Sequence, residues 1–410
     1  MTSFYSALET REPSQRNAEQ IQAVAAQVAH AQSTCPAWAD ILQGIDASAL
    51  TSAEAIALLP VTRKSSLIEL QKNNQPFGGL VSTEAAPITY IFTSPGPIYE
   101  PGFDVPDLWH FARALYAAGL RKGDLVHNSF SYHFTPAGAM FDNAAKAIGC
   151  TIIAAGVGNT EMQAQSLAAL KPKAYVGTPS FLKILLEKAD ELELDVTSLT
   201  HAVVGGEPFF PAQQAFFKAC GLQVLQGYAT ADLGSIAYET LAQEGMVIDE
   251  EVYLEIVRPG TGDLVADGEV GEVVVTNFSR NYPLIRFATG DMSAIMVGQS
   301  PCGRTNKRIK GWMGRADQAT KVRGMFVRPE QVANLVAKHQ QLVKARLQVT
   351  QVDGQDSLQV LCETADASIE LAAAIAKSVR NVFHIRGEVV MQELGSLPND
   401  GIVIHDQREY

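Results

Sequence analysis

Asp291 is the residue whose neighbours best suit it to bind a small molecule. It follows the apolar stretch L-I-R-F at 284–287 and ends the turn Thr289-Gly290. A carboxylate at the end of a strand can accept hydrogen bonds from two hydroxyls at once, which suits the vicinal diol of a ribose. A surface Asp after a Gly is most often a plain turn residue, so Asp291 alone decides nothing.

A second polar stretch, G-R-A-D-Q-A-T-K-V-R-G, follows at 314–324. It places Arg315 and Asp317 before another extended run, an arrangement expected at the junction between two lobes. We therefore predict a large N-terminal lobe over residues 1–316 and a small C-terminal lobe over 317–410, which the chain length allows.

In this order, the two stretches resemble the signature of the adenylate-forming superfamily, and their details are similar to those of phenylacetate–CoA ligases. The resemblance implies that Asp291 holds the ribose of ATP. It also implies that Arg315 contacts the nucleotide and that Asp317 is the hinge of a mobile C-terminal lobe. These two residues are the predicted catalytic residues. Arg323 and Gly324 would border the path of coenzyme A, since a residue without a side chain lets a thin tunnel pass.

The sequence G-G-E-P at 205–208 closes a predicted strand at 201–206. Ligands of α/β sheets bind at the carboxyl ends of strands, and paired glycines let a flat ring lie against the backbone. The resemblance implies that Gly206, Glu207 and Pro208 pack on the adenine. A simple tight turn is the alternative.

The run G-Y-A-T-A-D at 227–232 is similar to the family's Y-G-x-[ST]-E segment. The resemblance places Gly227, Tyr228 and Ala229 beside the nucleotide and makes Asp232 the ligand of Mg²⁺. Asp keeps an oxygen suited to Mg²⁺ but reaches one methylene less than Glu. Ala231 removes the family's hydroxyl group.

Tyr132, His133 and Phe134 follow an apolar–polar strand. They match a stretch that lines the acyl pocket in the resembled family, which makes them the predicted substrate-binding residues. A lone His beside aromatic residues is more often structural, so this alternative stays open for His133.

Two stretches depart from the family pattern. The segment S-P-G-P-I-Y-E-P-G at 94–102 contains three prolines, which lack the backbone N–H that a phosphate loop uses, and has Glu100 where the family has a lysine. A like charge ~4 Å from a phosphate costs on the order of 4 kcal/mol at an effective dielectric constant of about 20. Near the C-terminus, Ile402 replaces the family's catalytic lysine, and an aliphatic residue cannot stabilise a charged transition state.

Strand and helix patterns alternate in the middle of the chain, which indicates a layered α/β sheet. The predicted strands lie at 150–156, 174–178 and 201–206, and the predicted helices at 136–148, 161–170, 179–191 and 211–219. Residues 245–278 predict antiparallel strands of a distorted β-barrel. We predict helices at 329–339 and 367–383 in the small α+β C-terminal lobe, which would sit on a hinge. These patterns predict an α/β fold class, and the resemblance implies that the fold is acetyl-CoA synthetase-like.

The composition narrows the function classes. The net charge of −12 argues against a nucleic-acid-binding surface. The five cysteines lack any C-x-x-C spacing and predict reduced thiols without a metal site, including Cys302 in S-P-C-G. Neither a signal segment nor an apolar run of transmembrane length is found, so we expect a cytoplasmic protein without a membrane partner.

The leading hypothesis is an AMP-forming acyl- or aryl-CoA ligase that uses ATP, Mg²⁺ and coenzyme A, with AMP as a product. Its partners would be a small carboxylic acid, aromatic by resemblance, and coenzyme A, with a homodimer as the candidate assembly. The competing hypothesis is a catalytically weakened homologue that binds nucleotide or acyl-CoA without efficient adenylation. A third is an enzyme that performs only the thioester-forming half of the reaction.

Overall fold

The computed structural model of the chain describes residues 4–94, 97–316, 318, 320–323, 325–352 and 355–408. The chain divides into two compact units. The first comprises Met1–Leu254, Val275–Thr289 and Met296–Trp312, and the second comprises Glu255–Val274, Gly290–Ile295 and Met313–Tyr410. The second unit therefore includes two short segments that precede the predicted C-terminal lobe. The predicted hinge, Asp317, lies outside the described residues, so the hinge remains a prediction.

A nine-stranded sheet with the strand order β14-β15-β10-β9-β8-β7-β6-β4-β5 is the main element of the first unit. Its strands are β4 (Leu125–Asn128), β5 (Thr151–Ala154), β6 (Ala174–Gly177), β7 (His201–Val204), β8 (Gln223–Thr230), β9 (Gly234–Glu239), β10 (Met246–Ile248), β14 (Ile295–Met296) and β15 (Arg308–Ile309). Strands β5, β4, β6, β7 and β8 are parallel, and β8, β9, β10 and β15 are antiparallel. The predicted alternation is confirmed by the connecting helices α6 (Ala137–Ile148), α7 (Thr160–Leu170), α8 (Pro179–Glu191) and α9 (Pro211–Ala219).

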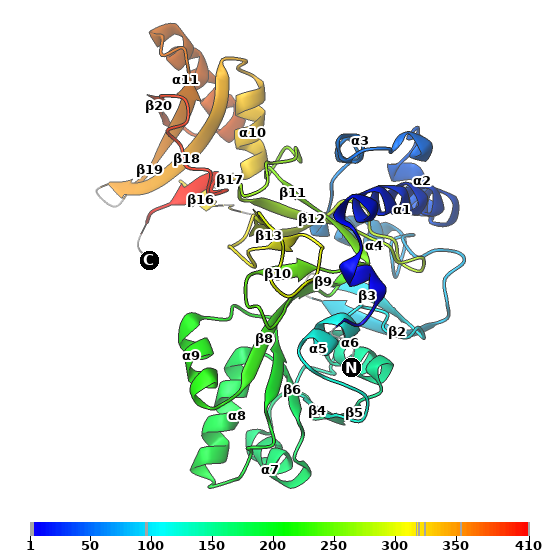
Figure 1. Cartoon of the computed structure of the whole chain (residues 1–410). Helices are drawn as coiled ribbons and strands as arrows, with labels where there is room; N and C mark the ends of the chain where they lie inside the picture. Colours follow the sequence, from blue (N-terminus) through cyan, green and yellow to red (C-terminus); the bar gives the residue numbers. More distant parts are fainter. Residues whose placement is uncertain are drawn as a thin grey trace. The chain divides into compact units, whose positions relative to one another are not determined.

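Both faces of the parallel strands are covered by helices (Figure 1). Val176 and Val203 pack in a cluster with residues of α5 (Ala112–Ala117) and α6. Tyr175 and Val204 pack in a second cluster with residues of α7, α8 and α9. Successive side chains of a strand point to opposite faces, so a strand covered on both sides needs apolar residues at every position. This requirement explains the continuous apolar runs that predicted these strands.

The N-terminal part of the first unit is helical and is followed by a β-hairpin. Its elements are η1 (Ala7–Thr10), α1 (Pro13–Thr34), α2 (Pro36–Ile41), η2 (Ala47–Ala49), α3 (Ala53–Ala57), α4 (Lys64–Asn73), β2 (Ile88–Ser94) and β3 (Ile98–Phe103). Residues 95–96, within the predicted phosphate loop, lie outside the described residues.

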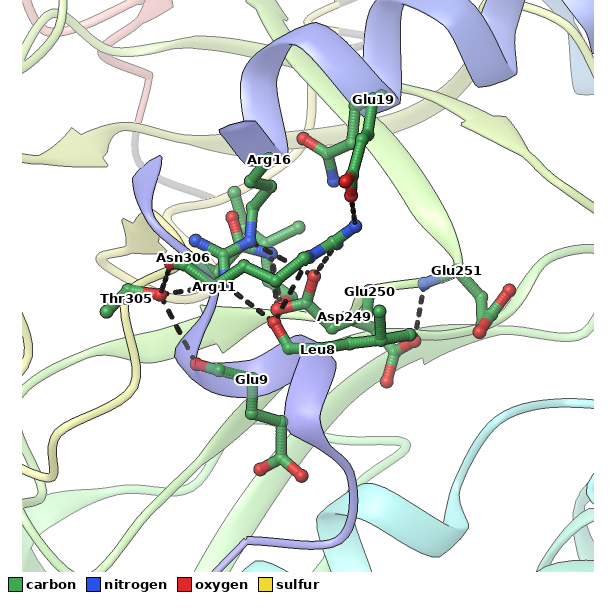
Figure 2. A network of polar contacts seen from close by, with 12 residues as sticks. Leu8, Glu9, Arg11, Arg16, Glu19, Asp249, Glu250, Glu251, Thr305 and Asn306 are labelled. Atoms are coloured by element: carbon green, nitrogen blue, oxygen red, sulfur yellow. Dashed lines mark hydrogen bonds and ion pairs between the residues drawn. The ribbon is translucent and has the colours of Figure 1, made fainter. Parts of the chain in front are cut away.

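A buried network of charges attaches the N-terminal segment to the rest of the first unit (Figure 2). Glu250 Oε2 accepts hydrogen bonds from Arg11 Nη2 at 2.6 Å and Arg16 Nε at 3.1 Å. The Glu250 side chain is only 1% exposed. Arg304 Nε donates to the buried Glu9 carboxylate at 2.6 Å. Buried charges are tolerated only when they are paired, so this network fixes the position of the segment.

A four-stranded sheet has the order β1-β13-β12-β11. Its strands are β1 (Thr62–Arg63), β11 (Val252–Val257), β12 (Gly271–Asn277) and β13 (Phe287–Ser293). Strands β11 and β12 fall in the stretch for which a distorted barrel is predicted. Among the described strands the sheet is open and not a closed barrel, because β1 and β11 form its two edges.

The C-terminal part of the second unit has its own α+β core. The sheet β20-β19-β18-β21 packs with two helices around one apolar cluster that includes Leu347, Val360 and Phe383. The elements are β16 (Thr320–Val322), β17 (Met325–Val327), α10 (Pro329–Ala337), β18 (Leu342–Val352), β19 (Gln355–Thr364), α11 (Ile369–Phe383), β20 (Glu388–Gln392) and β21 (Ile404–Asp406). Both predicted helices are confirmed, and Ser368 caps α11 by accepting a hydrogen bond from Leu371 N at 3.3 Å. Within the described residues, no helix combines the length and the apolar character needed to span a lipid bilayer.

The edge strand β21 makes the stability of this lobe sensitive to acid. Hydrogen bonds from Arg408 hold the pKa of Asp406 well below its usual range, and Thr320 also donates to this carboxylate. A depressed folded-state pKa gives stability that is present above the unfolded-state pKa of about 4 and is lost as the pH falls further. On acidification from pH 6 to pH 2.5, we expect the free energy of unfolding to fall by on the order of 1–3 kcal/mol more in the wild type than in Asp406→Asn. Hydrogen exchange of the β18 amides across this pH range measures the effect, and equal acid sensitivity of both proteins would contradict it.

Candidate functional site

The predicted adenine-binding segments are adjacent in the first unit. Val204 at the end of β7 pairs with Gln226 in β8, which brings the segment 205–208 beside 227–229. A Cβ atom on Gly205 would lie 3.0 Å from the carbonyl oxygen of Gly227, a tight contact that favours glycine at this close approach of the two strands. The structure thus brings together at one sheet edge the residues proposed to bind adenine, namely Gly206, Glu207, Pro208, Gly227, Tyr228 and Ala229.

Two of these residues have contacts that the sequence pattern did not reveal. The Glu207 carboxylate accepts a hydrogen bond from Ser180 N at 2.6 Å, in the first turn of α8. A carboxylate is stabilised there by the helix dipole, so Glu207 also has a structural role. The Tyr228 hydroxyl donates to Thr289 Oγ1 at 3.0 Å. This bond connects strand β8 to β13, the strand that carries Asp291 two residues further on.

Asp291 and Arg315 form an ion pair in the second unit. Arg315 Nη1 lies 3.0 Å from Asp291 Oδ1, and the two side chains are 53% and 13% exposed, respectively. Backbone hydrogen bonds from Ala316 N to Gly290 O and from Met292 N to Gly314 O hold the two segments together. The two residues predicted to contact the ribose and the nucleotide are therefore neighbours. The largely exposed guanidinium can turn towards an anion while the backbone keeps Asp291 in place.

Asp232 lies in a buried polar cluster of the first unit. Its Oδ2 atom accepts a hydrogen bond from Lys64 Nζ at 2.9 Å, and Lys64 also donates to Ser94 Oγ at 3.3 Å. Ser94 in turn donates to Glu100, which is only 3% exposed. Burial raises the pKa of Glu100 to about 7, and the nearby Asp232 charge adds to the shift, although the Ser94 hydrogen bond opposes it.

These contacts change two expectations. Glu100 lies on strand β3, and its side chain is buried beside Ser94 of strand β2. The expected repulsion between Glu100 and a phosphate therefore does not apply to this arrangement. The sequence pattern predicted no role for Lys64, which ends the stretch L-P-V-T-R-K at 59–64. Its ion pair with a residue 168 positions away could not be read from local spacing.

The side chains around Asp232 do not fit the predicted directly coordinated Mg²⁺. One Asp232 oxygen is already paired with the Lys64 ammonium, and the side chain is 1% exposed. Among the described residues, no three His, Cys, Asp or Glu side chains are grouped so that they could hold a metal ion. Mg²⁺ needs near-octahedral oxygen ligands and keeps several waters, for which this buried carboxylate offers no room.

The predicted substrate residues differ in their surroundings. The Tyr132 hydroxyl donates to Asp142 Oδ1 at 2.7 Å, and Asn128 Nδ2 donates to the same oxygen at 3.1 Å. This pairing fixes the Tyr132 ring. His133 and Phe134 are exposed, Phe134 at 79%. Tyr132 is therefore the best held of the three, and no local pattern in the sequence indicates that Asp142 is its partner.

The predicted residues for coenzyme A and the hinge are only partly described. Arg323 N donates to Asp356 Oδ2 and Arg323 Nε to Asp356 O, both at 2.8 Å, so this residue is anchored to strand β19 of the C-terminal sheet. Gly324 and Asp317 lie outside the described residues, and their roles remain predictions.

Comparisons with known proteins agree with the predicted fold. Residues 117–279 match the family of AMP-binding enzymes. The chain is 29% identical over 360 residues to a phenylacetate-coenzyme A ligase of Aromatoleum evansii, covering 83% of this chain and 80% of that protein. It is also 29% identical over 367 residues to a protein of the same name from Escherichia coli, covering 83% and 82%, respectively.

The chain is thus similar to phenylacetate–CoA ligases and to the AMP-binding enzymes. A solved structure of 2-hydroxyisobutyryl-CoA ligase in complex with 2-HIB-AMP and CoA superposes with a TM-score of 0.72 at 23% identity, covering 100% of this chain and 93% of that one. This match confirms the predicted fold class.

Proposed function

We propose that the protein is an AMP-forming acyl- or aryl-CoA ligase. A carboxylate would attack the α-phosphate of ATP and release pyrophosphate, and the thiolate of coenzyme A would then displace AMP from the acyl-adenylate. The pairing of Asp291 with Arg315 is the observation that carries this proposal, because it sets a diol-binding carboxylate beside a cation suited to a phosphate. The names of the relatives support an aromatic acid as the substrate.

The proposed roles follow the geometry of each unit. Asp291 accepts the two ribose hydroxyls, and the adjacent segments 205–208 and 227–229 provide the surface on which adenine lies. Tyr132, oriented by Asp142, lines the pocket for the acid. Arg323 and Gly324 border the coenzyme A path, and Asp317 is the hinge. Cytoplasmic location, a homodimer and a Mg²⁺ ion that accompanies ATP remain predictions from the sequence.

Lys64 is the cation that we propose for the developing charge on the phosphates. Its side chain is 37% exposed, so the ammonium can leave Asp232 and contact an anion that enters above the β2–β3 hairpin. The expected result for Lys64→Ala is a loss of about 100-fold or more in the adenylation rate, since a preorganised charge stabilises the transition state. Pyrophosphate release measures the rate, and Lys72→Ala on the same helix serves as the matched control. A rate equal to that of the control would contradict this role.

The test of the proposed function is a pyrophosphate-release assay with ATP, Mg²⁺, coenzyme A and a panel of aryl and alkyl acids. Turnover with an aromatic acid and formation of its thioester would support the ligase. Ile402 favours the second candidate, a nucleotide binder with little adenylation. This residue lines a largely apolar cavity of ≈ 270 Å³ in the second unit. An aliphatic side chain in such a place cannot stabilise a charged transition state. Silence across the panel together with AMP binding by calorimetry would favour that binder.

A further inference from the structure

A small cavity of ≈ 20 Å³ lies beside the β2–β3 hairpin in the first unit, lined among others by Glu100, Asp232 and Tyr282. These three residues are buried, with 3%, 6% and 5% of their whole-residue surface exposed, respectively. Glu100 Oε2, Asp232 Oδ1 and the Tyr282 hydroxyl have no hydrogen-bond partner among the residues that the structure describes. Three unsatisfied polar groups therefore meet at one void.

Such an arrangement is costly unless something fills it. A buried donor or acceptor without a partner lowers the stability of the folded state, and more so when it is charged. A cavity needs roughly 10–15 Å³ to hold one particle of the size of a water molecule, so this cavity holds about one such particle. The cavity is too small for an ion with its own shell of waters.

The charges around the cavity select the kind of particle. Glu100 and Asp232 contribute two carboxylates. The Lys64 ammonium contacts one of them, with its Nζ atom 2.9 Å from Asp232 Oδ2. Ser94 donates its only hydroxyl hydrogen to the other oxygen of Glu100. With both carboxylates ionised, one negative charge is left unbalanced. Water could satisfy the hydrogen bonds, but only a cation or a proton also balances the charge.

We propose that Glu100, Asp232 and Tyr282 bind a buried monovalent cation, with potassium as the best match in size. Its ligands would be two carboxylate oxygens and one phenolic oxygen, the hard oxygen donors that such ions prefer. Magnesium is a poor match, because it retains several of its waters and needs near-octahedral geometry. The cation would join three separate segments, namely strand β3, the turn between β8 and β9, and the loop that follows β12.

The first test compares the full-length protein in potassium chloride, sodium chloride and choline chloride at equal ionic strength. A ligand that binds only the folded state raises the melting temperature by mass action. We expect the melting temperature to be about 2–5 °C higher in potassium than in choline, with sodium in between. Thallium(I), a potassium mimic, should show a bound resonance that potassium displaces. Equal melting temperatures in all three salts, with no bound thallium signal, would overturn the proposal and leave a water molecule or a proton in the cavity.

Variants test whether the ion binds at this cavity. Glu100→Gln removes one charge and should abolish the difference between potassium and choline, whereas the exposed Glu161→Gln should leave it unchanged. Tyr282→Phe keeps the shape of the core and should weaken potassium binding about 10-fold, which keeps the proposal testable if Glu100→Gln fails to fold. An undiminished potassium effect in Tyr282→Phe would place the ion elsewhere and refute this site.

Discussion

Replacing Asp291 by Ala is expected to weaken the binding of AMP and ATP by at least about 100-fold. The wild-type carboxylate would accept two hydrogen bonds from the ribose diol, and each hydrogen bond to a charged group contributes about 1.5–3 kcal/mol. Isothermal titration calorimetry with AMP measures the affinity directly, without dependence on turnover. Asp291→Asn keeps an acceptor but loses the charge, so an intermediate loss is expected.

The chain contains a matched control for this experiment. Asp263 also ends a T-G-D tripeptide, at 261–263, and is exposed. Asp263→Ala should bind AMP as the wild type does, because the proposed role of Asp291 depends on the turn in which it lies and not on the T-G-D tripeptide alone. Wild-type affinity in Asp291→Ala would show that the nucleotide binds elsewhere, and the proposed function would lose the observation that carries it.

Replacing Glu250 by Ala is expected to lower the free energy of unfolding by about 3–5 kcal/mol. The change leaves Arg11 and Arg16 without the buried carboxylate that both contact (Figure 2), and an uncompensated buried charge is strongly destabilising. Urea unfolding, followed by circular dichroism, measures the loss. AMP affinity at low urea should change little, since Glu250 is not among the proposed ligand-binding residues.

Glu19 provides the comparison within the same network. It also pairs with Arg11, but its side chain is 42% exposed. Exposed ion pairs contribute about 0–1 kcal/mol, so Glu19→Ala should be nearly neutral. Equal losses for Glu250→Ala and Glu19→Ala would mean that burial does not determine the strength of these pairs here.

The layered sheet could be predicted from the sequence because the patterns that indicate its strands and its helices are both local. Strands such as β6 need apolar residues at every position, and the helices between them carry a helical period, so both patterns lie within short windows of the chain. Asp291 and Arg315 were identified from the resemblance of two short motifs to those of a known family, and the two residues are only 24 positions apart.

The contacts of Asp232 and Glu100 could not be predicted in the same way. Lys64 pairs with Asp232 across 168 positions, and nothing in the stretch around Glu100 indicates that its side chain is buried. The extent of the barrel was likewise not predictable, because alternating residues at 245–278 specify which face of a strand is buried and not whether a sheet closes. Long-range packing decides these features.

The buried attachment of the N-terminal segment has a consequence for biosynthesis. Arg16 leaves the ribosome 234 residues before its partner Glu250. At about 5–20 residues per second, this separation corresponds to roughly 10–50 s of translation. Throughout that interval the arginines of the segment have no buried carboxylate to pair with, so this part of the first unit can reach its final arrangement only late in chain synthesis.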